Sequence, residues 1–275
     1  MAQTRWLLTA MVMTMVVIAV GPAVSASNGA QPPVPGVFPT TTTTAKPKPV
    51  PPTTTTTAYE SRVPEQGFGP GDHDPAIQTA ELMLNGQHYD VGKIDDTYDQ
   101  DTAYAVTAFQ KIHGMERTGR LTRDVAAKLR QQKSPPPPLM SGGGARRIEI
   151  DLPRQVLLLI VDNAVAKVLP ISTGSGRHYC ENGDCGVART PLGSYRVAYY
   201  SSGWVHSPLG WMYNPVYYDT NRGIAIHGSK SVPSYPASHG CVRIPMTSAE
   251  WFPGQAPGGT PVYVLDGETY VQPLS

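Results

Sequence analysis

The residues most able to do chemistry lie in the segment SHGCVR at positions 238–243, which contains one of the three cysteines of the chain. A cysteine nucleophile needs a base within hydrogen-bond reach, and that base needs a group that orients it. Two histidines are candidates for the base. His239 lies two residues before Cys241, and His227 stands at the end of a predicted strand. This pattern favours nucleophilic catalysis by the thiol.

Three neighbouring residues would assist the thiol. Gly228 and Gly240 let a substrate approach the backbone closely, and their amides can form an oxyanion hole. Arg243 adds a positive charge, which is expected to lower the thiol pKa from about 8.5 and to favour the thiolate. It can also hold a substrate carboxylate. The alternative is that Cys241 is a small buried hydrophobic residue, as a cysteine between glycine and valine often is.

The other two cysteines, Cys180 and Cys185, enclose the turn sequence Glu-Asn-Gly-Asp, and we predict a local disulfide across this loop. The alternatives are two free thiols, or a metal site with His178. A closed zinc site takes four ligands, and the sequence offers no fourth, so we predict no metal and no organic cofactor. If Cys180 and Cys185 form a disulfide, Cys241 is left as a free thiol without a partner for a disulfide. A lone thiol outside the cell is liable to oxidation, which suggests that Cys241 is kept for its reactivity.

Composition restricts the classes of partner. The 22 basic and 21 acidic side chains leave a formal charge of +1, which argues against a nucleic-acid binder and against a polybasic membrane-surface protein. A chain of 275 residues has room for about two domains. However, 28 prolines and 27 glycines indicate that part of the chain is linker.

The N-terminal segment 1–26 reads as a signal peptide, with Arg5 before an apolar run at 6–20 and the small-residue pattern Val-Ser-Ala at 24–26. An uncleaved signal anchor is the alternative, and it would be the sole contact with a membrane. In either case we expect an exported protein of a cell wall or periplasm-like space, secreted or signal-anchored.

The rest of the chain divides by composition. Residues 27–71 form a Thr/Pro-rich linker predicted to be disordered, because they hold little to bury. Residues 72–132 show helical periodicity near 77–84, 102–113 and 122–129. Residues 133–144 form a Pro/Gly linker. Residues 145–275 are rich in strands, predicted at 148–152, 155–161, 164–171, 194–200, 215–219, 223–227 and 261–265, with one helix at 247–252. The predicted fold class is therefore multidomain α + β, with a small three-helix domain followed by a mainly antiparallel β domain.

His227 and Gly228, followed by SHGCVR, resemble the signature of the L,D-transpeptidase (YkuD-type) catalytic domain. That signature is a histidine and, after a variable loop, Ser or Thr, then His-Gly-Cys, a hydrophobic residue, and Asn or Arg. Three further features match in order: Ser-Thr-Gly at 172–174, TPLGSY at 190–195 and GTPV at 259–262. The resemblance covers 146–266 and implies an L,D-transpeptidase-like β-sandwich with short helices.

The resemblance also implies a role for each residue of the signature. Cys241 corresponds to the nucleophile and His227 to its general base, which the backbone carbonyl of Gly228 orients. His239 and Gly240 are expected to line the oxyanion region. Four residues are expected to bind substrate: Ser238, Arg243, Tyr213 and Tyr217.

The family's pattern does not assign a role to two parts of the chain. The tyrosines at 213 and 217, with Trp211, can wall the cleft, although aromatic strand residues are more often core. The CENGDC segment at 180–185 is an insertion that the general pattern lacks. Like the short loop between His227 and Ser238, it could alter the choice of acceptor.

The implied reaction is acyl transfer on peptidoglycan stem peptides. The thiolate attacks the carbonyl of the third residue of a tetrapeptide stem, releases D-Ala and forms a thioester, which an amine of a neighbouring stem resolves into a 3→3 cross-link. Carbapenems commonly acylate this family. The alternatives are an L,D-carboxypeptidase that uses the same residues, a non-catalytic peptidoglycan-binding protein, and an enzyme that attaches a protein to the wall.

The helical segment at 72–132 resembles the peptidoglycan-binding three-helix domain. The matching residues are Leu82, Leu84, Asp96, Tyr98, Thr102, Ala105, Val106, Phe109, Gln110, Gly114, Gly119 and Leu121. This resemblance implies glycan strands and stem peptides of the wall as the ligand. The alternative is a domain that only docks on the catalytic unit.

Overall fold

The computed structural model describes residues 57–181, 183–267 and 274. The predicted signal peptide at 1–26 and residues 27–56 of the predicted linker lie outside the described residues. Within the part that is described, no helix has both the length and the apolar character needed to cross a bilayer.

The N-terminal part of the described chain is a helical module that starts earlier than predicted. Its helices are α1 (Thr57–Arg62), α2 (Pro75–Gly86), α3 (Gln100–Ile112) and α4 (Arg123–Gln131). Residues 57–71 were expected in the disordered linker, but they include α1, and Val63 and Phe68 are buried in the core of the module. Phe68 also forms a β-bridge with Leu121. These apolar side chains supply enough burial to order a segment that is otherwise rich in proline and glycine.

The C-terminal part contains two five-stranded sheets. The first has the order β3-β2-β1-β12-β6 and consists of β1 (Arg147–Asp151), β2 (Val156–Val161), β3 (Ala164–Pro170), β6 (Gly193–Arg196) and β12 (Pro261–Leu265). The second consists of β7 (Tyr199–Tyr200), β8 (Trp204–Ser207), β9 (Gly210–Asp219), β10 (Ile224–Gly228) and β11 (Val242–Ile244). Its order is β11-β10-β9-β7, with β8 paired to β9. Most pairs are antiparallel, but β1–β12 and β10–β11 are parallel.

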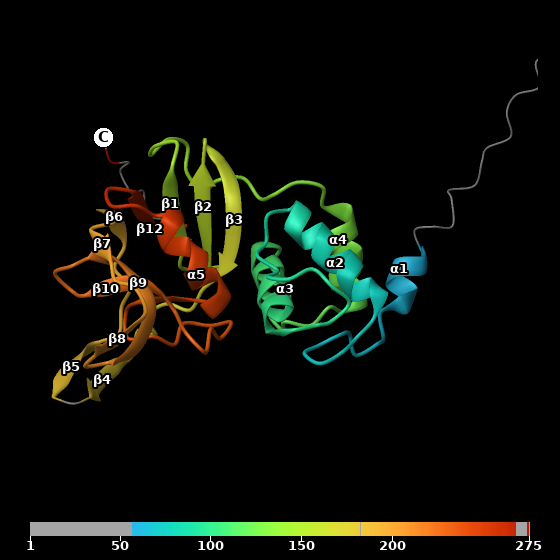
Figure 1. The fold of residues 1–275 in the computed structure, drawn as a ribbon, viewed down its shortest axis with the longest axis horizontal. Helices are drawn as coiled ribbons and strands as arrows, with labels where there is room; N and C mark the ends of the chain where they lie inside the picture. Colours follow the sequence, from blue (N-terminus) through green and yellow to red (C-terminus); the bar gives the residue numbers. More distant parts are fainter. Residues whose placement is uncertain (1–56, 182, 268–273, 275) are drawn as a thin grey trace, which may run out of the picture. The chain divides into compact units, whose positions relative to one another are not determined.

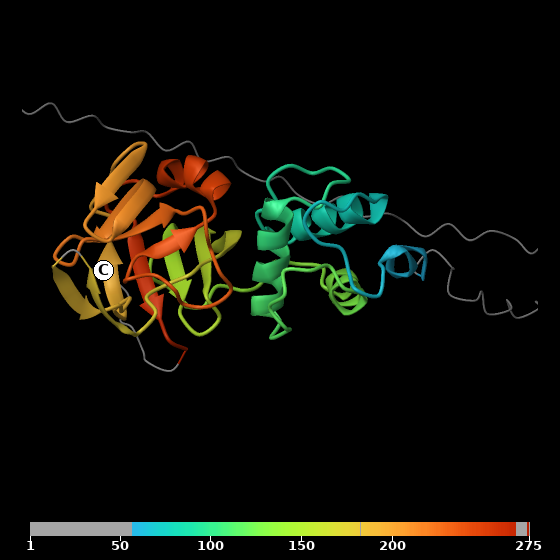
Figure 2. The same ribbon diagram turned by 90° about the horizontal axis from the view of Figure 1, so that it is seen from below.

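Two smaller elements complete this part. A hairpin of β4 (His178–Glu181) and β5 (Asp184–Val187) stands apart from both sheets as a separate two-stranded ribbon. Helix α5 (Met246–Gln255) packs on β9 and β10 and adds Ala249 and Phe252 to the core between the sheets (Figure 2).

The position of strand β2 in the fold explains why residues 156–161 form a continuous apolar run. In the first sheet, β1, β2 and β3 lie side by side (Figure 1). Leu157 and Leu159 face the core between the two sheets, whereas Leu158 and Ile160 belong to the core of the helical module. Both faces of this strand are therefore covered, and its sequence has no reason to alternate with polar residues.

Several strands differ from the sequence prediction. The strand expected at 194–200 is divided into β6 and β7, which belong to different sheets, and the strand expected at 215–219 extends back to Gly210. Strands β4, β5, β8 and β11 were not predicted. These strands are short, and they form because they pair with neighbouring strands, not because their own sequence shows a strand periodicity.

The helical module packs directly on the first sheet. Lys111 of α3 is 1% exposed, and its Nζ donates to the carbonyl oxygens of Gln155 and Ile171, each at 2.9 Å. Ser248 and Trp251 of α5 donate to the Asp90 carboxylate at 2.7 and 3.2 Å. The helical module therefore packs on the C-terminal β part and forms one folded unit with it.

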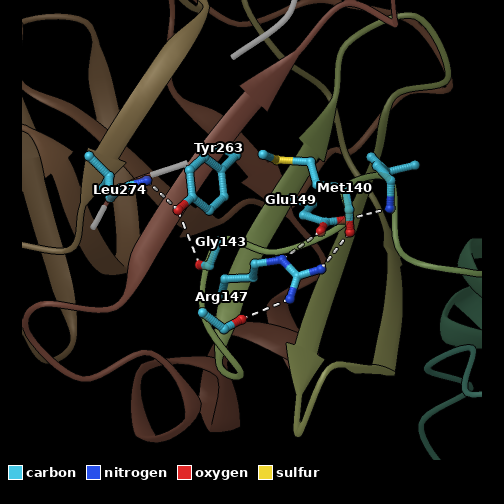
Figure 3. A network of polar contacts seen from close by, with 8 residues as sticks. Met140, Gly143, Arg147, Glu149, Tyr263 and Leu274 are labelled. Atoms are coloured by element: carbon cyan, nitrogen blue, oxygen red, sulfur yellow. Dashed lines mark hydrogen bonds and ion pairs between the residues drawn. The ribbon is translucent and has the colours of Figure 1, made fainter. Parts of the chain in front are cut away.

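The Pro/Gly linker at 133–144 has no helix or strand but is held by a buried ion pair at the start of β1 (Figure 3). Arg147 Nε lies 2.7 Å from Glu149 Oε1, and both side chains are inaccessible to solvent or nearly so. The Arg147 guanidinium donates to the carbonyls of Met140 and Gly144, and Glu149 Oε2 accepts from the Leu139 amide. The linker thus supplies the hydrogen bonds that a buried ion pair needs.

We expect Glu149→Gln to lower the free energy of unfolding by about 3 kcal/mol, because it leaves the Arg147 charge buried without its partner. Urea unfolding followed by circular dichroism measures this change. Glu65→Gln, at an exposed position, is the matched control and should change the free energy by less than about 0.5 kcal/mol. An equal, small effect of both substitutions would contradict a stabilising role for the pair.

Lys111 gives the stability of the protein a specific pH dependence. Burial lowers its pKa to about 7, whereas the unfolded chain keeps the proton up to about pH 10. Between these values the unfolded state binds more protons, so the free energy of unfolding should rise from about pH 7 to about pH 9. Lys111→Met should flatten this rise in the free energy of unfolding. Lys93 has an exposed side chain, so Lys93→Met is the control and should retain the rise. Equal slopes for Lys111→Met and the unsubstituted chain would contradict the assignment.

Candidate active site

The parallel pairing of β10 with β11 determines which side chains share the site. Ile226 pairs with Val242, and His227 pairs with Arg243. Neighbouring residues on parallel strands point to the same face, and side chains alternate along each strand. His227, Arg243 and Cys241, which directly precedes β11, therefore lie on one face. Ile226 and Val242 point the other way, into the core between the sheets.

This face opens into a cleft of about 530 Å³. Six predicted site residues line the cleft: His227, Ser238, His239, Gly240, Cys241 and Arg243. Side chains from the β4–β5 hairpin and from β9 complete its walls, among them Tyr179, Asp184, Trp211 and Met212. The structure therefore brings together residues that are far apart in the sequence.

The Cys241 thiol is half-enclosed by the backbone at the start of β10 and in the turn before it. The Ala225 amide donates to its Sγ at 3.5 Å, and Sγ lies 3.8 Å from the Gly223 carbonyl oxygen and 4.0 Å from Met212 Sδ. Burial raises the pKa of the thiol, and the Ala225 amide and Arg243 oppose this rise only in part. Arg243 acts to lower the thiol pKa, as predicted, but the expected preference for the thiolate is wrong, because desolvation of the thiolate outweighs the nearby charge.

His227 is held by its own backbone neighbour. Its Nδ1 lies 2.9 Å from the carbonyl oxygen of Gly228. Because a carbonyl oxygen can only accept a hydrogen bond, Nδ1 carries the proton, and Nε2 is left as the basic nitrogen. Burial, together with the charge of Arg243, lowers the pKa of His227 to about 4, although the hydrogen bond to the Gly228 carbonyl acts in the opposite direction. A Cβ on Gly228 would lie 2.7 Å from Ala249 Cβ of α5, so only glycine fits beside the histidine.

Ser238 and Thr190 hold the cysteine loop in place. Ser238 Oγ donates to the Cys241 carbonyl at 2.5 Å and accepts from the Gly240 amide at 3.1 Å, and Thr190 Oγ1 donates to the Gly240 carbonyl at 2.6 Å. Gly240 has φ of +151°, and a Cβ there would lie 2.9 Å from the Arg189 carbonyl oxygen. The Gly240 amide is therefore engaged by Ser238, which differs from the expectation that it points outward as an oxyanion donor.

His239 contacts the inserted hairpin rather than the thiol. Its Nε2 lies 3.1 Å from Glu181 Oε1, and its ring meets Tyr179 edge-on at 4.8 Å between ring centroids. A disulfide joins Cys180 to Cys185 and closes this hairpin. The insertion that the sequence placed outside the general pattern thus forms one wall of the site.

The two tyrosines expected to bind substrate do not line the cleft. Tyr213 contacts Trp204 of β8 at 5.2 Å between ring centroids, and Tyr217 stacks on Tyr199 of β7 at 4.7 Å. Their rings are used in contacts with the adjacent strands β8 and β7. The residues of β9 that do line the cleft are Gly210, Trp211 and Met212.

Sequence reasoning missed several cleft residues. Arg189 immediately precedes the TPLGSY segment, whose position next to a family motif was an available signal. Met212, Tyr179 and Asp184 offered no local signal, because they reach the site only through the pairing of β9 with β10 and the position of the hairpin.

Two family models match the chain. The L,D-transpeptidase catalytic domain matches residues 145–264, and the peptidoglycan binding domain matches residues 73–129. Domains of these families act on peptidoglycan, which indicates peptidoglycan as the partner and an extracytoplasmic location.

One of the similar solved structures gives the same family. The crystal structure of the L,D-transpeptidase from Xylanimonas cellulosilytica is 34% identical, with a TM-score of 0.68, and the alignment covers 74% of this chain and 98% of that chain. L,D-transpeptidases from Stackebrandtia nassauensis and Mycobacterium tuberculosis are 18% and 20% identical. Their alignments cover 72% and 49% of this chain and 97% and 60% of their own chains, with TM-scores of 0.41 and 0.37. No curated protein matches the chain. On the identity and coverage of the Xylanimonas structure, this chain belongs to the L,D-transpeptidase family.

Proposed function

We propose that the chain is a cysteine acyltransferase that forms 3→3 cross-links between peptidoglycan stem peptides. The observation that carries the proposal is that Cys241 and His227 lie on one face of the β10–β11 pair and open into one cleft. A nucleophile and an oriented base in one enclosed site are the minimum requirement for covalent acyl transfer.

In the first half-reaction the Cys241 sulfur attacks the carbonyl carbon of the third residue of a tetrapeptide stem. His227 Nε2 takes the thiol proton at attack and returns a proton to the departing amine, so that D-Ala leaves and a thioester remains. The pKa values of the resting site favour this order. With the thiol pKa raised and the His227 pKa lowered to about 4, both groups are neutral at pH 7. The proton therefore moves during attack rather than before it.

In the second half-reaction the side-chain amine of the third residue of a neighbouring stem attacks the thioester. His227 Nε2 takes a proton from this amine, a new amide forms, and the thiol is regenerated. If water attacks in place of the amine, the same site acts as an L,D-carboxypeptidase, which is the alternative. Carbapenems, whose β-lactam carbonyl is an electrophile, are expected to acylate the same sulfur.

The charges of the cleft suit an acidic peptide donor. Arg189 and Arg243 both line it, and a guanidinium binds a carboxylate in a planar, two-point geometry. Stem peptides carry free carboxylates, including the one on the D-Ala that leaves. We assign Arg243 to substrate binding, and Ser238 to holding the loop on which the nucleophile stands.

The remaining parts of the chain would bring this site to its polymer. We propose that the helical module binds wall glycopeptide and that segment 1–26 directs export, either cleaved after Ala26 or retained as an anchor. The Thr/Pro-rich segment then serves as a spacer.

The test of this function uses the chain without segment 1–26, mixed with a disaccharide-tetrapeptide and followed by mass spectrometry. We expect released D-Ala together with a cross-linked dimer, and neither product from Cys241→Ala. Released D-Ala without dimer, in the presence of a free acceptor amine, would favour the carboxypeptidase. No turnover by the reduced, unsubstituted protein would favour a non-catalytic binding protein.

The protonation state of the site gives a second prediction. Because burial raises the pKa of Cys241, its alkylation by iodoacetamide should accelerate about tenfold per pH unit between about pH 7 and pH 9, without a plateau. Intact-protein mass spectrometry follows the single free thiol, since Cys180 and Cys185 are bonded. N-acetylcysteine is the control for the reagent. A rate that is already constant below pH 7 would indicate a preformed thiolate–imidazolium pair and contradict the neutral resting site.

A further inference from the structure

Two exposed tryptophans form a groove beside the catalytic cleft. Trp204 of β8 is 46% exposed and Trp211 of β9 is 62% exposed. Together with Ser229 and Lys230 they line a groove of about 540 Å³. Large exposed aromatic side chains that gather in a hollow, with polar residues at its edge, often mark a binding surface.

The groove is continuous with the cleft that holds Cys241. Trp211 and Ser229 line both the groove and the cleft. A molecule whose reactive part occupies the cleft would therefore place its attached portion in the groove.

Both indole rings are held in position by neighbours. Trp204 contacts Tyr213 at 5.2 Å and Trp211 contacts His206 at 4.7 Å, measured between ring centroids. The Lys230 ammonium lies 5.9 Å from the centre of the Trp204 ring. Rings supported in this way lose little conformational freedom when a ligand stacks on them, and the ammonium adds a hydrogen-bond donor at the edge of the groove.

We propose that this groove binds the glycan strand of the donor, a chain of β-1,4-linked N-acetylated amino sugars. The proposal rests on the proposed function, in which the stem peptide enters the cleft. A pyranose ring presents an apolar C–H face, which matches an indole ring, and a rim of hydroxyl and acetamido groups, which Lys230 and Ser229 can bind. Because the stem is covalently attached to its sugar, the sugar must lie next to the cleft, where the groove is.

The size of the groove argues against a second protein molecule as its occupant. A stable protein interface buries about 800 Å² on each partner and involves about 20–30 residues a side. The groove is lined by four residues, which is the scale of one or two sugar rings.

The kinetic experiment compares two donors, the disaccharide-tetrapeptide and the same tetrapeptide without sugars. We expect Trp204→Ala, at a residue that lines the groove but not the cleft, to lower kcat/KM for D-Ala release about tenfold with the sugar-bearing donor, mainly through KM, and to leave the sugar-free donor unchanged. Because Trp211 also lines the cleft, Trp211→Ala should lower kcat/KM more with the sugar-bearing donor than with the sugar-free one. Trp211→Phe, which keeps an aromatic face, should recover most of the loss. Tyr200→Ala is the matched control, because Tyr200 is 56% exposed and does not line the groove.

Two kinetic results would overturn the proposal. Equal losses with both donors would show that the tryptophans act on the peptide or on the fold, and no loss with either donor would show that the groove is not used.

A binding experiment separates this proposal from the proposed function. The Cys241→Ala chain is titrated with a β-1,4-linked tetrasaccharide of N-acetylglucosamine, and the heat of binding is recorded by isothermal titration calorimetry, which does not depend on the substituted tryptophan. A saturable change that Trp211→Ala abolishes and Tyr200→Ala retains supports the groove even if no D-Ala is ever released. A change that survives in Trp211→Ala, or no change at all, overturns it whatever the enzyme does.

Discussion

The parallel pairing of β10 with β11 is the constraint on which the site depends. It places Cys241 and Arg243 on the same face as His227 and turns Ile226 and Val242 into the core. A shift of one residue in this register would move the thiol to the opposite face. Parallel strands also need a crossover of about a dozen residues, and here the loop 229–241 makes that crossing. The chemistry therefore depends on how firmly this loop and its register are held.

Three parts of the protein hold the crossover. In the segment after β3, the Thr173 carbonyl accepts hydrogen bonds from the amides of Ala237 and Ser238. Ser172 of the same segment forms a β-bridge with Arg243. Thr190 and Ser238 hold the turn at Gly240. The helical module contributes as well, since the Tyr104 hydroxyl accepts from the Val232 amide and Arg117 donates to the Ser234 carbonyl. A module of a peptidoglycan-binding family thus supports the loop that carries the catalytic motif.

Sequence reasoning was most successful where the determinants are local. The capping residues Asp74, Asp99 and Thr122 precede helices close to the predicted positions. The resemblance of the segment around Cys241 to a family signature predicted that Cys241 and His227 share one site, and the β10–β11 pairing brings both residues to one cleft. Interactions across the chain could not be predicted in this way. The contact of Glu181 with His239 and the docking of Lys111 on the first sheet join segments that no local pattern connects. The net effect on the thiol pKa also required burial, which the sequence around Arg243 does not reveal.

The proposed reaction requires a covalent thioester intermediate on Cys241, and one measurement detects this intermediate directly. The protein is mixed with a disaccharide-tetrapeptide whose third-residue amine is acetylated, so that the donor cannot serve as acceptor, and the reaction is quenched in acid within milliseconds to seconds. Peptide mapping by mass spectrometry should then find a mass increase equal to the donor less D-Ala on the peptide that contains Cys241. The adduct should be absent in Cys241→Ala and should disappear when a free acceptor amine is added. Release of D-Ala at the normal rate with no adduct on Cys241, or with an adduct at another residue, would contradict the account.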